Sequence, residues 1–195
     1  MSLFEPDGAL PTEPSGLSLR DEFITPAEEQ ALIELIGTLP LHNAQYKQYT
    51  ARRRVINFGS SYDFDENVLR EAPDIPADFA FLRERLAHWL GIESQAFTQL
   101  LVAEYAPGTP LGWHRDVPDY EIVAGVSLGT RAVLRFRPYP HRPGVKAAVR
   151  ELEAAPRSAY AMQGPARWEW QHSVPPTPGR RWSLTFRTRA ARGRG

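Results

Sequence analysis

The sequence contains no cysteine, which excludes disulfide bonds and every metal site built from thiolates. It also contains no run of about 18 apolar residues, the length that a membrane-spanning helix requires. Residues 1–14 are acidic and rich in proline, unlike the basic and then apolar order of a secretory signal. We therefore expect a protein with no membrane span that resides in the cytoplasm.

The sequence also lacks a net charge at neutral pH, because 23 lysine and arginine residues balance 23 aspartate and glutamate residues. The charges are unevenly spread along the chain. Residues 1–30 hold seven acids and one base, whereas residues 131–150 hold six bases and residues 180–195 hold six arginines, both without an acid. This distribution is compatible with a basic face for a polyanionic partner and equally with an ordinary solvated surface.

The chain is long enough for one folded domain. It has 195 residues, of which 42% are hydrophobic and 24% charged, as in soluble globular proteins. Residues 1–16 contain few large apolar side chains and predict a flexible N-terminal extension, and residues 190–195 predict an arginine-rich tail. We expect residues 17–189 to form a single domain and the protein to be a monomer.

Two helices are predicted in the first half of the chain. Thr25, Pro26 and Glu28 have the spacing of a capping box with proline at the first helical position, and apolar residues follow at one-face spacing as far as Pro40. Residues 76–90 show the same spacing and end at Gly91.

The second half has a period of two residues, which predicts strands. Six candidates are separated by turn residues: 100–105, 123–128, 132–137, 159–162, 167–172 and 181–187. Between them, residues 138–156 predict a loop with a helical middle. Helices followed by many short strands favour an α+β fold, a double-sheet jelly roll with two supporting N-terminal helices.

Aromatic and basic residues interleave between residues 46 and 65, among them Tyr46, Arg53 and Tyr62. Aromatic rings stack on nucleobases and arginines pair with phosphates, so this segment is a candidate for contact with nucleic acid. Short half-buried strands have the same composition, because aromatic and β-branched residues fit a pleated surface. The segment alone does not decide between the two interpretations.

Residues 112–116 hold the strongest candidate for a metal site. Side chains two positions apart point to the same side of an extended strand, so His114 and Asp116 can reach one cation. His172 is the best candidate for a third ligand. Two histidines and one carboxylate on one face of an ion, with the other positions open, are typical of non-haem Fe(II) oxygenases.

A strand at residues 181–187 offers donors for an anionic co-substrate. Alternation places Arg181 and Arg187 on one face with Ser183 and Thr185, opposite three apolar residues. Arginine binds carboxylates through two parallel charge-assisted hydrogen bonds. The two arginines are separated by roughly 20 Å along the strand, so they cannot grip the same atoms, although their long side chains could reach opposite ends of one small dicarboxylate. Outward arginines on a surface strand are the alternative.

Other segments stand in a recognisable order around these residues: Phe58-Gly59 with Tyr62, Tyr105-Ala106-Pro107-Gly108, Ser127-Leu128-Gly129, Gly164-Pro165-Ala166-Arg167, and the ending Arg181-Trp182-Ser183-Leu184-Thr185-Phe186-Arg187. Together with the H-x-D pair and His172, they resemble the F-G-x-x-Y, Y-x-P-G, S-L-G and R-x-N-L-T-F-R motifs of the AlkB family. This is a family of Fe(II)- and 2-oxoglutarate-dependent dioxygenases. The resemblance covers residues 45–188.

The resemblance implies a fold, cofactors and residue roles. The implied fold is a double-stranded β-helix, in agreement with the strand pattern. His114, Asp116 and His172 would bind the catalytic Fe(II), and 2-oxoglutarate and O₂ would be co-substrates. Tyr105 and Arg181 would hold the distal carboxylate of 2-oxoglutarate, with Arg187 near its metal-chelating end. The family reaction removes N-methyl groups oxidatively as formaldehyde.

Two positions depart from the family pattern and bear on the substrate. Ala103 stands where repair enzymes carry an asparagine that contacts 2-oxoglutarate, and Pro118 stands where the bacterial repair enzyme carries an acid that helps to set base preference. We predict demethylation of N-alkylated bases in single-stranded or unpaired DNA or RNA, in repair or modification. The alternative is a 2-oxoglutarate-dependent hydroxylase or demethylase of a protein or small molecule. Substrate contacts are predicted for Tyr46, Arg53, Tyr62, Trp113, Arg135 and Trp170.

Overall fold

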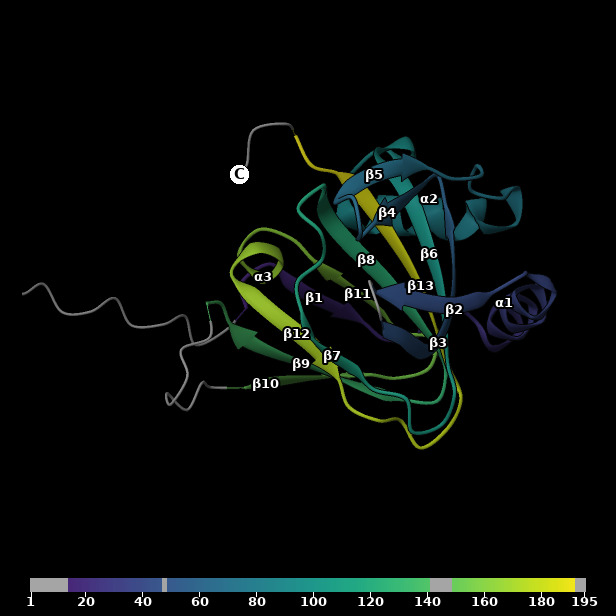
Figure 1. Cartoon of the computed structure of the whole chain (residues 1–195). Coiled ribbons are helices and arrows are strands. Elements are labelled where there is room, and N and C mark those ends of the chain that lie inside the picture. Colours follow the sequence, from purple (N-terminus) through teal and green to yellow (C-terminus); the bar gives the residue numbers. More distant parts are fainter. Residues whose placement is uncertain (1–13, 47–48, 141–148, 192–195) are drawn as a thin grey trace, which may run out of the picture.

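Two antiparallel sheets face each other in this computed structural model (Figure 1). The structure describes residues 14–46, 49–140 and 149–191, without the side chains of residues 45, 46 and 49–51. The larger sheet has seven strands in the order β1 (Leu17–Arg20), β11 (Ala159–Met162), β8 (Tyr120–Gly129), β13 (Arg181–Arg189), β6 (Phe97–Tyr105), β3 (Tyr49–Phe58) and β2 (His42–Tyr46). The smaller sheet has the order β10 (Arg150–Ala154), β9 (Ala132–Pro138), β12 (Trp170–Val174) and β7 (Leu111–His114). A separate hairpin consists of β4 (Ser60–Asp63) and β5 (Val68–Glu71).

This architecture confirms the predicted jelly roll, or double-stranded β-helix, with two supporting N-terminal helices. Strands that are distant in the sequence lie side by side in both sheets. β13 pairs with β6 and β8 in the larger sheet, and β12 pairs with β7 and β9 in the smaller sheet. The last two strands of the chain therefore carry their inward-facing residues to the middle of the molecule.

The helices cover the outer face of the larger sheet (Figure 1). Helix α1 (Pro26–Thr38) begins with the predicted capping box, in which the Thr25 hydroxyl accepts from the Glu28 backbone and the Glu28 carboxylate accepts from the Thr25 backbone. Helix α2 (Ala80–Leu90) follows the 3₁₀ turn η1 (Ala77–Phe79) and ends at Gly91, whose φ of 67° is left-handed. A second 3₁₀ turn, η2 (Ser94–Ala96), leads into β6.

The alternation of β13 separates the two environments on either side of the larger sheet. Trp182, Leu184 and Phe186 pack into the cluster that holds the two helices. The intervening residues, from Arg181 to Arg187, face the space between the sheets. The inner face of this strand is therefore polar and available for chemistry, as the sequence predicts.

Three segments differ from the expectations. Residues 167–172 do not form one strand, because Gly164 and Pro165 start the helical turn α3 (Pro165–Trp168) before β12 begins. In the segment 138–156, which the sequence predicts to be a loop with a helical middle, residues 150–154 form strand β10. Residues 141–148 of that segment lie outside the described residues. Strand β7 ends at His114, so Asp116 lies in the segment that follows the strand.

The expected N-terminal extension is packed at its inner end. The Ser15 carbonyl accepts from the Ala166 amide at 2.8 Å, and the Gly16 carbonyl accepts from the Gln163 amide at 3.1 Å. Most of the expected extension and tail, residues 1–13 and 192–195, lies outside the described residues. None of the described helices is long and apolar enough to cross a membrane.

Candidate active site

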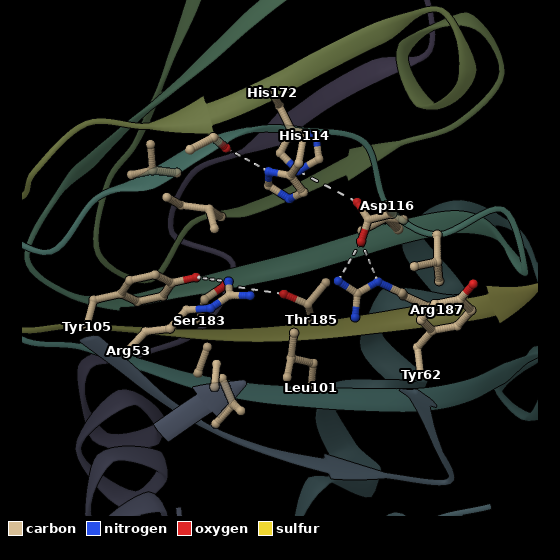
Figure 2. Close-up of a pocket in the computed structure, with 18 of the residues that line it drawn as sticks. Arg53, Tyr62, Leu101, Tyr105, His114, Asp116, His172, Ser183, Thr185 and Arg187 are labelled. Atoms are coloured by element: carbon tan, nitrogen blue, oxygen red, sulfur yellow. Dashed lines mark hydrogen bonds and ion pairs between the residues drawn. The ribbon is translucent and has the colours of Figure 1, made fainter. Parts of the chain in front are cut away.

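The three predicted metal ligands come together between the sheets (Figure 2). His114 on β7 and His172 on β12 are direct partners in the strand register, and Asp116 follows two residues later. One ligand atom from each residue lies within 4.8 Å of the other two. Tertiary pairing of β7 with β12 thus brings together residues that are far apart in the chain.

The protonation states of these side chains suit metal binding. Burial lowers the pKa of His114, and burial together with neighbouring His114 lowers the pKa of His172 to about 3. Burial alone would raise the pKa of Asp116, but the positive charge of Arg187 holds it well below its usual range. Two neutral imidazoles and an ionised carboxylate are the forms that bind divalent cations.

Hydrogen bonds orient two of the ligands. The Gly112 carbonyl lies 2.9 Å from Nδ1 of His114, so a proton on Nδ1 leaves Nε2 as the metal-binding atom. Arg187 donates from Nε and Nη2 to Oδ1 of Asp116, at 2.8 and 2.6 Å. The other oxygen, Oδ2, faces His172 at 3.6 Å from Nε2. Two histidines and a carboxylate arranged in this way fit an Fe(II) ion.

A buried arginine holds the segment that carries Asp116. Arg167 is only 3% exposed, and its guanidinium donates to the backbone carbonyls of Asp116, Val117 and Tyr120 at 2.6 to 3.2 Å. Sequence reasoning missed this residue, because it was placed on an ordinary strand. The only available signal was its position after the Gly164–Pro165 turn.

The opposite end of the site is a row of three side chains from adjacent strands. Arg53 on β3, Tyr105 on β6 and Arg181 on β13 lie side by side on the inner face. Nη1 of Arg53 donates to the Tyr105 hydroxyl at 3.3 Å, and the Arg181 guanidinium carbon lies 5.2 Å from the Tyr105 ring centroid. Burial raises the pKa of the Tyr105 phenol, but the two positive charges outweigh burial and lower it. This row attracts an anion.

A cavity of about 940 Å³ joins this row to the metal ligands. Ser183 and Thr185 line its floor between the two ends, as Figure 2 shows. Tyr62 and Phe64, whose ring centroids are 5.1 Å apart, line it from the hairpin side. A volume of this size is in the upper range for small-molecule sites, so the cavity has room for a co-substrate and a flat substrate group.

Most of the predicted site residues line this cavity: Arg53, Tyr62, Tyr105, Trp113, His114, Asp116, His172, Arg181 and Arg187. Arg135 lies on the outer face of the smaller sheet and does not line the cavity. Trp170 is 1% exposed and packs into the core, so it offers no surface to a substrate, and that interpretation is corrected. Tyr46 lies on β2, but its side chain is outside the description. Besides Arg167, sequence reasoning missed Phe64 and also Gln99, whose carbonyl oxygen accepts from Arg187 at 2.8 Å.

Comparisons with known proteins identify the family of this chain. A family profile described as the 2OG-Fe(II) oxygenase superfamily matches residues 21–187. Protein L905 of Acanthamoeba polyphaga mimivirus, an uncharacterized protein, is 27% identical over 173 residues, which cover 83% of this chain and 74% of that protein. The mouse tRNA (carboxymethyluridine(34)-5-O)-methyltransferase ALKBH8 is 27% identical over 170 residues, which cover 84% of this chain and 24% of that protein. The solved structure of OsALKBH1 superposes with a TM-score of 0.71 at 16% identity, covering 92% of this chain and all of that one.

The chain belongs to the 2OG-Fe(II) oxygenase superfamily. It is a dioxygenase that uses Fe(II), 2-oxoglutarate and O₂, and its ALKBH relatives confirm the AlkB resemblance predicted from the sequence. It spans about a quarter of the length of the mouse ALKBH8 protein, so the activity of that whole protein is not transferred to it.

Proposed function

We propose that this dioxygenase removes N-alkyl groups oxidatively from bases in single-stranded DNA or RNA. The observation that carries the proposal is the lining of the cavity beyond the metal ligands. The residues that line it there include the aromatic residues Tyr62, Phe64 and Trp113 and the basic residues Arg52 and Arg115. Stacking rings combined with cations suit a base attached to a phosphate backbone.

Each part of the site has a proposed role in the reaction. His114, Asp116 and His172 hold Fe(II), and the row of Arg53, Tyr105 and Arg181 holds the distal carboxylate of 2-oxoglutarate. Arg187 fixes Asp116 at the metal-binding end. When bound, Fe(II) with 2-oxoglutarate and O₂ supplies the oxidising power that hydroxylates an N-methyl carbon, after which the product releases formaldehyde.

The depth of the metal ligands limits the form of the nucleic acid. The side chains of Asp116 and His172 are 6% and 11% exposed, so a methyl group can approach them only on a base that has left its stack. An unpaired base reaches the site at lower cost than a paired one, because less stacking and pairing has to be broken. This favours single-stranded substrates.

The names of two relatives support a nucleic-acid target. The mouse relative is named as an enzyme of tRNA, and an Arabidopsis thaliana relative, 25% identical over 181 residues, is named an alkylated DNA repair protein. The choice between DNA and RNA, and the bases accepted, belong to this proposal. A monomeric state, a cytoplasmic location and a single domain at residues 17–189 stay predictions from the sequence.

The test is mass spectrometry of single-stranded oligonucleotides that carry 1-methyladenine or 3-methylcytosine, with succinate followed in the same reaction. We expect methyl loss that depends on both Fe(II) and 2-oxoglutarate, and no methyl loss with His114→Ala or Asp116→Ala. Thermal melting checks that the variants remain folded. Succinate formation without methyl loss from either oligonucleotide would contradict the proposal and favour a protein or small-molecule substrate.

A further inference from the structure

A strip of cationic and aromatic side chains lies on the outer face of the four-stranded sheet, turned away from the core. We call it the arginine strip and define it by Trp113, Arg115, Arg135, Arg137 and Tyr139. The alternation of β9 places both of its arginines on this face, because the residues between and beside them are buried. Trp113 and Arg115 also line the cavity, so the strip is continuous with the active site.

The two arginines of β9 are held in fixed positions. Nε of Arg137 donates to Oε1 of Gln171 at 2.9 Å, and Nε of Arg135 donates to Oγ of Ser173 at 3.3 Å. Both guanidinium groups also lie over the ring of Trp113, with their central carbons 4.4 and 5.3 Å from its centroid. A planar guanidinium that is already positioned loses little conformational freedom when it binds a ligand.

The terminal nitrogens of these arginines remain available. Arg135 and Arg137 form no ion pair with any described residue, and only their Nε atoms donate hydrogen bonds within the described part of the chain. Glu151 on β10 lies opposite Arg135 in the strand register and borders the strip on that side. Paired terminal nitrogens match the geometry of two oxygens on a phosphate.

The third cation of the strip lies next to the metal ligands. Arg115 donates to the backbone carbonyl of Trp168 at 2.8 Å and lies over the ring of Tyr139, with its central carbon 3.7 Å from the centroid. Its neighbours in the sequence are His114 and Asp116, so it joins the strip to the reaction site. Tyr139 is 42% exposed and offers a ring for base stacking.

We propose that the arginine strip binds the phosphates of a single-stranded nucleic acid whose target base lies in the cavity. The inference rests on the proposed function and gives the path of the strand outside the active site. Arg135 and Arg137 are two residues apart on one strand, a separation of about 7 Å, so each can contact a different phosphate. Three cations without acidic partners among the described residues complement a polyanion, whereas a neutral peptide would leave them unpaired.

The test is fluorescence anisotropy with an unmodified single-stranded oligonucleotide of about 15 nucleotides, titrated between about 50 and 200 mM salt. Arg135→Gln/Arg137→Gln should weaken binding about tenfold for each arginine. It should also reduce the slope of log affinity against log salt by about 0.7 for each phosphate that is no longer neutralised. Arg20→Gln/Arg180→Gln removes the same charge from exposed positions outside the strip and should bind like the wild type.

A second variant tests the geometry. Arg135→Lys/Arg137→Lys keeps the charges and loses the planar fork, so it should retain the salt slope and bind more weakly than the wild type. Melting midpoints check that all variants are folded.

Three results would contradict the proposal that the arginine strip binds phosphates. They are equal binding by the glutamine variant and its control, absence of salt-dependent binding by the wild type, and equal affinity for polyglutamate of the same length. Methyl removal is measured separately on methylated oligonucleotides. Binding that depends on the strip without methyl loss would support the strip and contradict the demethylase proposal. Methyl loss with an unchanged KM in the glutamine variant would support the demethylase proposal and contradict the proposed role of the arginine strip.

Discussion

At the scale of single residues, Asp116 divides its two oxygens between two tasks. Oδ1 accepts both hydrogen bonds from Arg187, while Oδ2 faces His172. The arrangement keeps the carboxylate ionised although it is buried, and it fixes the rotation of the group. Partners that orient a metal ligand in this way raise the affinity for the metal.

We therefore predict that Arg187→Met lowers the affinity for Fe(II) by about 10- to 100-fold. The buried Asp116 carboxylate would lose its charged partner and its fixed orientation. Anaerobic calorimetry with Fe(II), in the absence of 2-oxoglutarate, measures the effect on the metal alone. Arg189→Met, an exposed position on the same strand, is the matched control. Equal metal affinity in both variants would show that Arg187 does not act through Asp116.

Arg53 is the second residue whose position yields a prediction. Its guanidinium lies beside Tyr105, in the row that also contains Arg181. Ala103 lies two residues before Tyr105 on β6 and cannot supply the amide that the repair enzymes use to contact 2-oxoglutarate. A second arginine can take over part of that interaction, because it donates charge-assisted hydrogen bonds to the same carboxylate.

Arg53→Met should weaken 2-oxoglutarate binding about tenfold, measured by calorimetry on protein loaded with Mn(II). Arg54→Met, on the opposite face of the same strand, is the control. A 2-oxo acid without a distal carboxylate should bind Arg53→Met and the wild type equally well. If affinity fell equally for both acids, Arg53 would act on the structure of the pocket and not on the carboxylate.

At the scale of elements, the start of helix α1 is tied to helix α2 by one carboxylate. Glu28 completes the capping box and also accepts from Arg85 at 2.6 Å. The hydrogen bonds from Arg85 and from the Thr25 backbone lower the pKa of Glu28 to about 2. Since the folded protein prefers the ionised form, this contribution is complete above the ordinary pKa of 4.5 and is lost as the pH falls towards 2.

Glu28→Gln should therefore reduce the free energy of unfolding by about 1 kcal/mol at pH 7, a modest value because the ion pair is partly solvated. Glutamine can still accept the capping hydrogen bonds, so the change mainly removes the charge. Urea unfolding at several pH values should show this difference shrinking below the ordinary pKa of glutamate. Glu34→Gln, exposed on the same helix, should have little effect. A difference that persists unchanged to low pH would exclude the ionic contribution.

Elements with strong local signals could be predicted from the sequence. The capping box of α1, the glycine end of α2 and the two faces of β13 all follow from residue type and spacing. Helical turn α3 was missed because a four-residue helix leaves almost no periodicity. The site required more than spacing, since nothing local indicates that β7 pairs with β12. Family motifs supplied that connection, while Arg167 and Gln99 act through contacts that only the folded chain reveals.

At the scale of the whole molecule, the two faces of the larger sheet have different roles. Its outer face packs on helices α1 and α2, and its inner face carries the polar row and the cavity. The triad depends on both sheets, because Arg187 on β13 holds Asp116, and His114 and His172 come from the smaller sheet. A metal bound there would therefore couple the two layers.

Metal binding should for this reason stabilise the whole fold. With Fe(II) or Mn(II) present at about 100 times its dissociation constant, the free energy of unfolding should rise by about 2.7 kcal/mol. For a domain of this size, that corresponds to a rise of roughly 5 to 10 °C in the melting midpoint. Differential scanning calorimetry of metal-loaded and chelator-treated protein measures it. His172→Ala should melt at the same temperature with and without metal, whereas Arg131→Ala, exposed at a turn, should show the full rise. An equal rise in His172→Ala would mean that the metal stabilises the protein from another site.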